Sequence, residues 1–496
     1  MASPLILAID QGSSSTKCLL VDAAGRVVAR GQAEVATATP NPGWVEQDAN
    51  DIWRSVRGAI AAVLTAETAP RIAAVGLSNQ RESCLIWNRW TGEPITPALS
   101  WQDKRTETLC EELRGRGHAA SVRRLSGLPL DPMFSAAKIR WLLDAIDPDR
   151  ARARSGELCA GTIDAYLLAR LSAGHVIEAG NAARLQLVDV EANSYSDELL
   201  AIFDIPAALL PRIVKSVGPF TRTRDLAPLP DGVPVSAVMA DSHAALFAHG
   251  AFAPGPVKAT HGTGASIMGL LDRGQAGERL HPGVCLTLAW WIDAPMLAFE
   301  GNIRSAGSTL LWAADLLGID AAELARLAST VASSEAVQFV PAFGGLGAPW
   351  WDAGAVATLC GMSLGQPRAM VARAALDSIA HQIADVVDAV RSGGVPVERL
   401  HVDGGPTRND QLMQFEADML GCPVARTDIA ELSALGVAHL AGYAEGMFSL
   451  GQLGALERGG RVFTPSADDQ ARVARRAAWR TAVARARRAP ELTEAA

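Results

Sequence analysis

Hydrophobic residues in the first part of the chain come in short runs that glycine, serine and aspartate interrupt. The apolar run at residues 5–9 is typical of a buried strand, and Asp10 and a stretch of small polar residues end it. Strand-like runs return after this stretch, and a helical period precedes another apolar run. The pattern therefore predicts a strand, a turn, two strands, a helix and a strand at residues 5–9, 12–17, 18–21, 27–29, 52–64 and 72–77.

A similar order begins again near residue 255. Two strand-like runs flank a glycine turn, and helical periods follow, the longest with its apolar residues on one face. The pattern predicts strands at residues 257–260, 266–271 and 400–403, and helices at residues 307–317, 370–390 and 411–420. Two α/β halves with matching beginnings predict an internal duplication with a cleft between them, although any two α/β domains can begin with a strand and a glycine turn.

Proline and glycine at residues 254–256 mark the boundary between these halves. We expect an N-terminal domain at residues 1–250, a C-terminal domain at residues 251–450 and a helical tail at residues 451–496. The tail contains an Ala/Arg-rich helical stretch at residues 467–488, whose basic residues we expect to face solvent.

Composition narrows the functional class. Of the 496 residues, 49% are apolar and 20% are charged, as in an ordinary globular protein. The formal charge of −8 argues against a nucleic-acid partner. Seven scattered cysteines without a Cys-x-x-Cys pair indicate reduced thiols. The start of the chain resembles no signal peptide, and the apolar stretch at residues 284–292 is too short to span a membrane. We therefore expect a cytoplasmic protein without membrane insertion.

Three glycine turns are candidate phosphate and nucleoside contacts. The first follows Asp10, the second lies at residues 262–264, and the third lies at residues 404–405 before a predicted helix. Glycine lets the backbone approach an anion closely, and consecutive amides and hydroxyls can bind phosphate oxygens. One such turn is weak evidence, but three at matching places predict sites for the β-phosphate, the γ-phosphate and the nucleoside of ATP.

Longer motifs include these turns or lie between them. They are found at residues 10–13, 42–48, 79–82, 100–106, 127–132, 161–164, 344–352 and 403–405, with Asn409. The turns resemble those of the sugar kinase, heat-shock chaperone and actin superfamily. The longer motifs resemble the FGGY carbohydrate kinases, and the glycerol kinases most closely. The resemblance covers roughly residues 5–450. It implies an α/β fold of two actin-like (ribonuclease H-like) ATPase domains that flank a central cleft.

The resemblance also implies roles for acceptor-site residues. Asp241 matches the catalytic aspartate, which takes the proton of the acceptor hydroxyl. Arg81, Glu82 and Trp101 match a clamp for a polyol or sugar. The alternatives are that Asp241 only caps the helix predicted at residues 244–248, and that Arg81 and Glu82 form a plain ion pair.

The implied cofactors are ATP and Mg²⁺. Asp10 and Asp241 match positions near the metal ion. The residues expected to bind ATP are Gly12, Ser13, Ser14, Ser15, Lys17, Thr263, Gly264, Gly307, Gly405 and Asn409.

Three positions that border the acceptor in glycerol kinases differ here. Met133 replaces a tyrosine, Ser242 a glutamine and Ser266 a phenylalanine. Smaller or more flexible side chains predict a wider and more polar acceptor site. Glycerol remains the leading acceptor on overall similarity, and a longer polyol or ketose, such as erythritol, a pentitol, xylulose or ribulose, is the alternative.

Residues 221–232 lack the glycine-and-arginine loop that binds fructose 1,6-bisphosphate in some glycerol kinases, so we expect no inhibition by that sugar.

A non-catalytic, chaperone-like or filament-like nucleotide-binding module is the rival class, but it leaves the clamp residues and Asp241 without a role. The resemblance is compatible with a homodimer or a homotetramer and does not decide between them.

Overall fold

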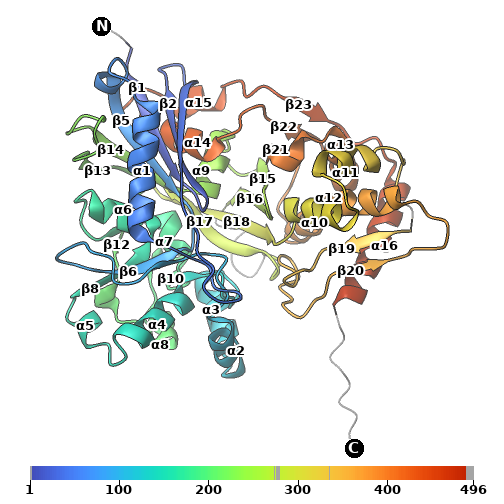
Figure 1. The fold of residues 1–496 in the computed structure, drawn as a ribbon, viewed down its shortest axis with the longest axis horizontal. Coiled ribbons are helices and arrows are strands. Elements are labelled where there is room, and N and C mark those ends of the chain that lie inside the picture. Colours follow the sequence, from blue (N-terminus) through green and yellow to red (C-terminus); the bar gives the residue numbers. More distant parts are fainter. Residues whose placement is uncertain (1–2, 273, 275–279, 335, 488–496) are drawn as a thin grey trace, which may run out of the picture. The chain divides into compact units, whose positions relative to one another are not determined.

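The computed structural model describes residues 3–272, 274, 280–334 and 336–487. Within them the chain forms two compact units, and most of their elements are labelled in Figure 1. The first unit takes in Met1–Phe252, Leu286–Ala298 and Glu431–Leu456, and the second takes in Ala253–Cys285, Phe299–Ala430 and Glu457–Ala496. Two segments from the later part of the chain therefore belong to the first unit.

The strands of the first unit are β1 (Leu5–Gln11), β2 (Ser15–Val21), β3 (Val27–Glu34), β4 (Glu46–Gln47), β5 (Ile72–Asn79), β6 (Cys84–Asn88), β7 (Ala98–Leu99), β8 (Leu158–Thr162), β9 (Val176–Glu178), β10 (Val188–Asp189), β11 (Ser194–Tyr195), β12 (Arg212–Val214), β13 (Val217–Arg222) and β14 (Pro234–Ala240). Its helices are α1 (Ala49–Val63), α2 (Glu107–Gly115), α3 (Ala119–Ser126), α4 (Ser135–Ile146), α5 (Ala151–Arg154), α6 (Ile163–Arg170), α7 (Ala179–Ala183), α8 (Asp197–Phe203), α9 (Asp241–Ala248), α14 (Leu432–Ala444) and α15 (Leu450–Gly454).

The main sheet of the first unit has the strand order β13-β14-β5-β1-β2-β3. Three neighbouring inner strands, β14, β5 and β1, run parallel, and β2 returns antiparallel beside β1. The residues of β1 and β5 are almost all buried, because helices cover the sheet. Three parallel neighbours place their carboxyl ends at one edge, where Asp10, Asn79 and Ala240 lie.

Helices pack closely on this sheet. Helix α1 packs against β2 and β3, and α14 packs against β5, β14 and β1. Gly76 in β5 allows the second contact, because a Cβ at that position would lie 2.5 Å from the carbonyl oxygen of Val437 in α14. Helix α14 is apolar nearly all round, as its burial between α9 and the sheet requires.

The strands of the second part of the chain are β15 (Val257–His261), β16 (Ala265–Leu271), β17 (Cys285–Trp291), β18 (Pro295–Ile303), β19 (Gln338–Val340), β20 (Thr358–Cys360), β21 (Leu400–Gly404), β22 (Val424–Arg426) and β23 (Arg461–Phe463). The helices are α10 (Gly307–Leu316), α11 (Ala321–Ala328), α12 (Arg368–Ser392), α13 (Asp410–Leu420) and α16 (Asp469–Ala486). Most of β17 and the start of β18 belong to the first unit.

The sheet that includes β15 has the order β17-β18-β16-β15-β21-β22-β23. Strand β15 pairs antiparallel with β16 and parallel with β21. Strand β1 has the same two kinds of neighbour, β2 and β5. The matching beginnings in the sequence therefore correspond to the same local topology in both sheets.

The predicted strands and helices are confirmed, with shifts of a few residues at their ends, but the tail expected to be helical also contains the strand β23. The expectation that the basic residues of the last helix face solvent holds for Arg480 and Arg485 but was wrong for Arg476. Arg476 of α16 is buried rather than solvated, because its guanidinium pairs with Asp385 and Asp388 of α12. Residue 488, the last of the predicted stretch, lies outside the described residues. Of the helices in the described part of the chain, none combines the length and apolar content needed to cross a bilayer.

Candidate active site

Asp241 and Arg81 come together where two parallel strands end. In the β5–β14 pair, Ala240 lies opposite Asn79, so the residues that follow both strands emerge at one edge of the sheet. There, Arg81 Nε lies 3.2 Å from Asp241 Oδ1. The same oxygen accepts a hydrogen bond of 2.6 Å from the backbone N–H of Ser242. Arg81 is buried, whereas the Asp241 side chain is 38% exposed, so the carboxylate is accessible from solvent.

The alternative role of Asp241, as a helix cap, fits the structure only in part. Asp241 is the first residue of α9, and the capping position belongs to Ala240, whose side chain makes no capping bond. A carboxylate in the first turn still interacts favourably with the helix dipole. The pairing with Arg81 across two strands is an additional contact that a capping role does not explain.

Glu82 follows Arg81 in an unusual conformation. Its φ of 59° lies in the left-handed region, which costs a non-glycine residue about 1–3 kcal/mol. Arg184 Nε lies 2.7 Å from Glu82 Oε1, whereas Arg81 Nε lies 4.0 Å from it. The main ionic partner of Glu82 is therefore Arg184, a residue that the sequence analysis missed. In the sequence, Arg184 stands out only as a single arginine among small and apolar residues.

Trp101 connects the clamp residues to the first glycine turn. Its indole Nε1–H donates to Ser13 Oγ at 3.0 Å, and its backbone N–H donates to Ser83 Oγ at 3.1 Å. Both serine hydroxyls in turn donate to Gln80 Oε1. Residues assigned from sequence to the acceptor and to the nucleotide therefore share one hydrogen-bond network.

Buried amide side chains hold the first turn in place. Gln47 Nε2 donates to the carbonyl oxygen of Ser13 at 2.6 Å. Gln80 Nε2 donates to the side-chain oxygens of Gln11 and Gln47. The turn itself is closed by a bond of 3.0 Å from the Gly12 N–H to the carbonyl oxygen of Ser15. Gln80 and Gln47 were part of recognised motifs, but this supporting role was not expected.

Asp10 lies at the end of β1, beside these residues. Burial, and next the negative charge of Asp241, raise the pKa of Asp10 to about 6. Lys17, its pairing partner on β2, acts in the opposite direction. Ser78 also acts to lower this pKa, yet neither its hydroxyl nor Asp10 Oδ1 makes a hydrogen bond of normal geometry to the described residues. A buried carboxylate oxygen of this kind suits a hard cation such as Mg²⁺, which takes one or two protein carboxylates together with substrate phosphates.

Two of the remaining acceptor-site candidates lie in the first unit. The backbone N–H of Met133 donates to Asp131 Oδ1 at 2.9 Å, and its carbonyl oxygen accepts from the buried ammonium group of Lys138. Ser242 is buried directly after Asp241. These contacts fix the backbone at both positions.

Ser266, by contrast, belongs to the second unit. Its hydroxyl donates to Glu300 Oε1 at 2.8 Å and accepts from Lys258 Nζ at 3.3 Å. Lys258 also reaches Thr260, whose hydroxyl donates to Asp403. Ser266 is thus part of a polar network across β15, β16, β18 and β21, which the sequence analysis did not anticipate.

The second unit brings the other nucleotide candidates together. The turn between β15 and β16 meets the N-terminus of α10, where the Gly307 N–H donates to Gly262 O at 2.9 Å. A Cβ at Gly307 would lie 2.6 Å from that oxygen, so this approach requires glycine. Because β15 and β21 are parallel neighbours, Gly404 and Gly405 emerge beside this turn.

The third turn leaves bare backbone exposed at Gly404 and Gly405. A Cβ at Gly405 would meet no heavy atom within 4 Å, so the space above it is open. Asn409 caps the N-terminus of α13, where its Oδ1 accepts from the Leu412 N–H at 3.0 Å. The structure therefore gives the Asn409 side chain a capping bond at the site where a nucleotide contact is expected.

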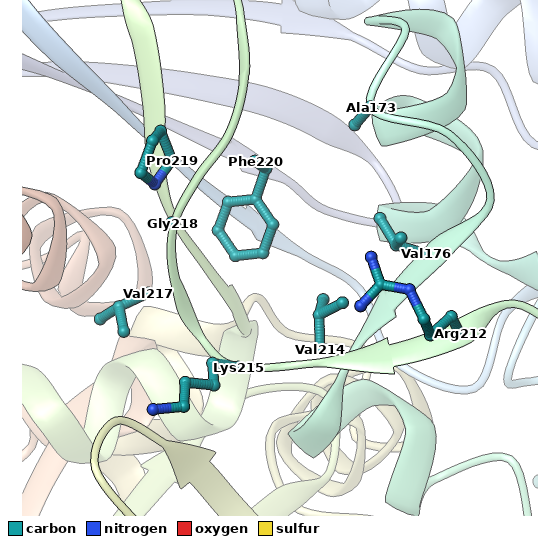
Figure 2. Close-up of a pocket in the computed structure, with 9 residues that line it drawn as sticks. All are labelled: Ala173, Val176, Arg212, Val214, Lys215, Val217, Gly218, Pro219 and Phe220. Carbon is teal, nitrogen blue, oxygen red and sulfur yellow. The ribbon is translucent and has the colours of Figure 1, made fainter.

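A separate cavity of about 350 Å³ lies elsewhere in the first unit (Figure 2). It is lined by Ala173, Val176, Arg212, Val214, Lys215, Val217, Gly218, Pro219 and Phe220. None of these is a predicted site residue, so the cavity is not part of the arrangement around Asp241.

Known proteins resemble this chain over nearly its whole length. An apulose kinase from Pectobacterium atrosepticum is 41% identical over 501 residues, covering 99% of this chain and all of the relative. A glycerol kinase from Aromatoleum aromaticum is 43% identical over 493 residues, covering 97% of this chain and 98% of the relative.

Solved structures share the fold of this chain. A glycerol kinase from Plasmodium falciparum, solved with ADP, has a TM-score of 0.89 at 28% identity and covers 98% of both chains. A xylulose kinase from Brucella ovis has a TM-score of 0.85 at 25% identity and covers 97% of both chains. Both confirm the expected two-domain α/β fold.

Family models point the same way. Residues 5–248 match the N-terminal domain, and residues 257–445 the C-terminal domain, of the FGGY family of carbohydrate kinases. Together these matches span most of the chain, and this protein therefore belongs to the FGGY family of carbohydrate kinases, which are ATP-dependent phosphotransferases.

Proposed function

We propose that this kinase phosphorylates a hydroxyl group of a small polyol or sugar, with glycerol as the leading acceptor and glycerol 3-phosphate as the product. The contact of 3.2 Å between Arg81 and Asp241, at the ends of β5 and β14, is the observation that carries this proposal. It unites a cation that can bind a hydroxyl oxygen with a carboxylate that can take a hydroxyl proton.

Asp241 is the proposed general base. As the acceptor oxygen attacks the γ-phosphorus of ATP, its proton passes to the Asp241 carboxylate, and the bond between that phosphorus and the bridging oxygen of ADP breaks. The partial exposure of the side chain supports this role, because an acceptor hydroxyl can approach it. Arg81 and the Ser242 N–H hold Oδ1, and this fixes the direction of the carboxylate.

Arg81, Glu82 and Trp101 form the proposed clamp. The Arg81 guanidinium donates hydrogen bonds and the Glu82 carboxylate accepts them, so neighbouring hydroxyls of a polyol can be satisfied in pairs. The indole of Trp101 offers an apolar face to the carbon chain. All three belong to one unit, and Ser83 connects them, because its hydroxyl accepts from the Trp101 N–H and its own N–H donates to the Arg81 carbonyl oxygen. This supports a common role.

ATP is the phosphate donor, and the proposed contacts fall into two groups. Those of the first turn lie in the first unit, and those of the second and third turns lie in the second unit. Asp10 and Asp241 are the proposed ligands of Mg²⁺, either directly or through water. When bound, Mg²⁺ neutralises charge on the β- and γ-phosphates. The unbonded oxygen of Asp10 supports this assignment.

The acceptor itself is the open choice. Met133 and Ser242 stand where glycerol kinases have a tyrosine and a glutamine, and these replacements support a wider acceptor site. Ser266 supports it only because it matches a phenylalanine of those kinases. The relative named apulose kinase, which is 41% identical over nearly the whole chain, favours a ketose as the second candidate. Glycerol is favoured by several relatives named glycerol kinase at similar identity.

A panel of acceptors tests this choice. The purified enzyme is assayed for ADP formation with glycerol, erythritol, pentitols, xylulose, ribulose and apulose, and kcat/KM is compared. A maximum on glycerol supports the leading candidate, and a maximum on a four- or five-carbon acceptor supports the wider site. ADP formation that responds to none of them contradicts the proposal.

We also propose that the enzyme works in the cytoplasm, where ATP is available.

A further inference from the structure

A second arginine, Arg184, binds the carboxylate of Glu82. Arg184 is fully buried, and its Nε lies 2.7 Å from Glu82 Oε1. Its guanidinium also lies over the ring of Phe134, at 5.1 Å from the centroid. A buried charge needs a partner of opposite sign, so each group compensates the burial of the other.

Helix α7, which ends next to Arg184, is fastened to the segment that carries Glu82. Asn181 of α7 and Asn79 at the end of β5 exchange two side-chain amide bonds, at 3.0 and 3.2 Å. Both the Asn181–Asn79 pair and the Arg184–Glu82 pair join residues 102 positions apart. The helix therefore braces residues 79–82 at two points.

The backbone conformation of Glu82 depends on support from neighbouring residues. Its left-handed conformation is one that glutamate rarely adopts, so surrounding contacts have to maintain it. The hydroxyl of Ser135 donates to the Glu82 carbonyl oxygen at 2.9 Å, and this contact fixes the backbone. Arg184 fixes the side chain.

We propose that Arg184 is a positioning residue for acceptor recognition. By binding Oε1, it sets the rotamer of Glu82 and directs the other carboxylate oxygen toward acceptor hydroxyls. The planar guanidinium makes this contact at a defined angle, which a lysine ammonium does not reproduce. The inference rests on the proposed function in one respect, namely that Glu82 contacts the acceptor.

The test compares four variants with the wild-type enzyme, each assayed with the acceptor that the wild type uses best. Arg184→Met removes the charge, Arg184→Lys keeps it without the planar geometry, and Glu82→Gln tests the premise. Arg150→Met is the matched control, because Arg150 is 2% exposed, lies in the same unit and pairs with Asp144 and Asp204, which are not site residues.

We expect Arg184→Met to raise the KM of the acceptor by at least about tenfold, while the KM of ATP changes by less than about twofold. Arg184→Lys should recover part of this loss. Arg150→Met should lower the unfolding temperature without a selective change in either KM. If Arg184→Met does not fold, the ratio of the two KM values in Arg184→Lys takes its place.

The outcomes separate the two claims. An unchanged acceptor KM in Glu82→Gln overturns the proposed contact between Glu82 and the acceptor, and with it the basis for Arg184. A raised acceptor KM in Glu82→Gln, with an unchanged value in the Arg184 variants, overturns the role of Arg184 alone. An equal rise of both KM values in Arg184→Met and Arg150→Met would show a merely structural effect and also overturn it.

Discussion

Arg81 Nε lies 3.2 Å from Asp241 Oδ1, and the two residues follow neighbouring parallel strands. The contact joins the proposed clamp to the proposed base. The Asp241 side chain is nevertheless 38% exposed. A cation at this place both orients the carboxylate and can bind the acceptor oxygen.

Removing this cation should impair use of the acceptor more than binding of ATP. We expect Arg81→Met to lower kcat/KM for the acceptor by about 10²-fold or more, since it disturbs both the acceptor and the base. Arg81→Lys should be intermediate, because it keeps the charge but not the Nε geometry. Steady-state kinetics with each substrate varied in turn provides the measurement. Equal losses in the KM of ATP and of the acceptor would speak against a role in the clamp.

The hydrogen bond between Trp101 and Ser13 links the acceptor clamp to the phosphate turn. A double-mutant cycle with Trp101→Phe and Ser13→Ala should give a coupling of about 0.5–1.5 kcal/mol in kcat/KM for the acceptor. Ser13→Ala alone also removes the bond to Gln80, so the double variant is needed to isolate the pair. Strictly additive effects would indicate that this bond does not contribute to turnover.

The raised pKa of Asp10 predicts a pH dependence of activity. Burial and the charge of Asp241 raise this pKa to about 6, so the carboxyl group gains a proton as the pH falls through that value. The neutral form no longer attracts a divalent cation. With Mg²⁺ in excess, kcat/KM for ATP should therefore be level above about pH 6 and fall tenfold per unit below it. A profile that stays level down to about pH 5 would contradict the role of Asp10.

A cluster in the second unit makes a prediction about stability. Asp385 of α12 accepts hydrogen bonds from Trp479 Nε1 at 2.8 Å and from Trp350 Nε1 at 3.2 Å, and it pairs with buried Arg476. Asp385→Ala leaves that guanidinium without its buried partner and should lower the free energy of unfolding by about 3–5 kcal/mol.

The matched control is Asp388→Ala. Its side chain is 41% exposed and also pairs with Arg476, so the expected loss is below about 1 kcal/mol. Denaturant unfolding of both variants provides the measurement. Losses of equal size would show that α16 is not held by the buried pair.

Much of the fold could be predicted because the sequence pattern is local. The apolar runs of β1, β5 and β15, and the one-sided periods of α1 and α12, are each visible within a short window. Helix α14 could not be assigned to the first unit in this way. It is apolar nearly all round, so its pattern does not indicate which surface it covers.

The site was partly predictable for the same reason. Asp10, Arg81 and Asp241 each follow a strand-like run or lie close to its end, and parallel pairing brings such positions together. Arg184 contacts Glu82, which is 102 positions away in the chain, and Gln80 contacts Gln11, which is 69 positions away. Contacts between residues so far apart leave no periodic signal in the sequence. The network of Ser266 depends on the register of β15 against β16, which pairs Thr260 with Ser266.

The role of Asp241 as the base is tested most directly by Asp241→Asn. This change keeps the size of the side chain and removes its ability to take a proton. We expect acceptor-dependent ADP formation to fall by at least about 10²-fold, while the Kd of ATP, measured by calorimetry without Mg²⁺, stays within about twofold of the wild-type value. Turnover close to that of the wild type in this variant would contradict the role of Asp241 and the proposed mechanism.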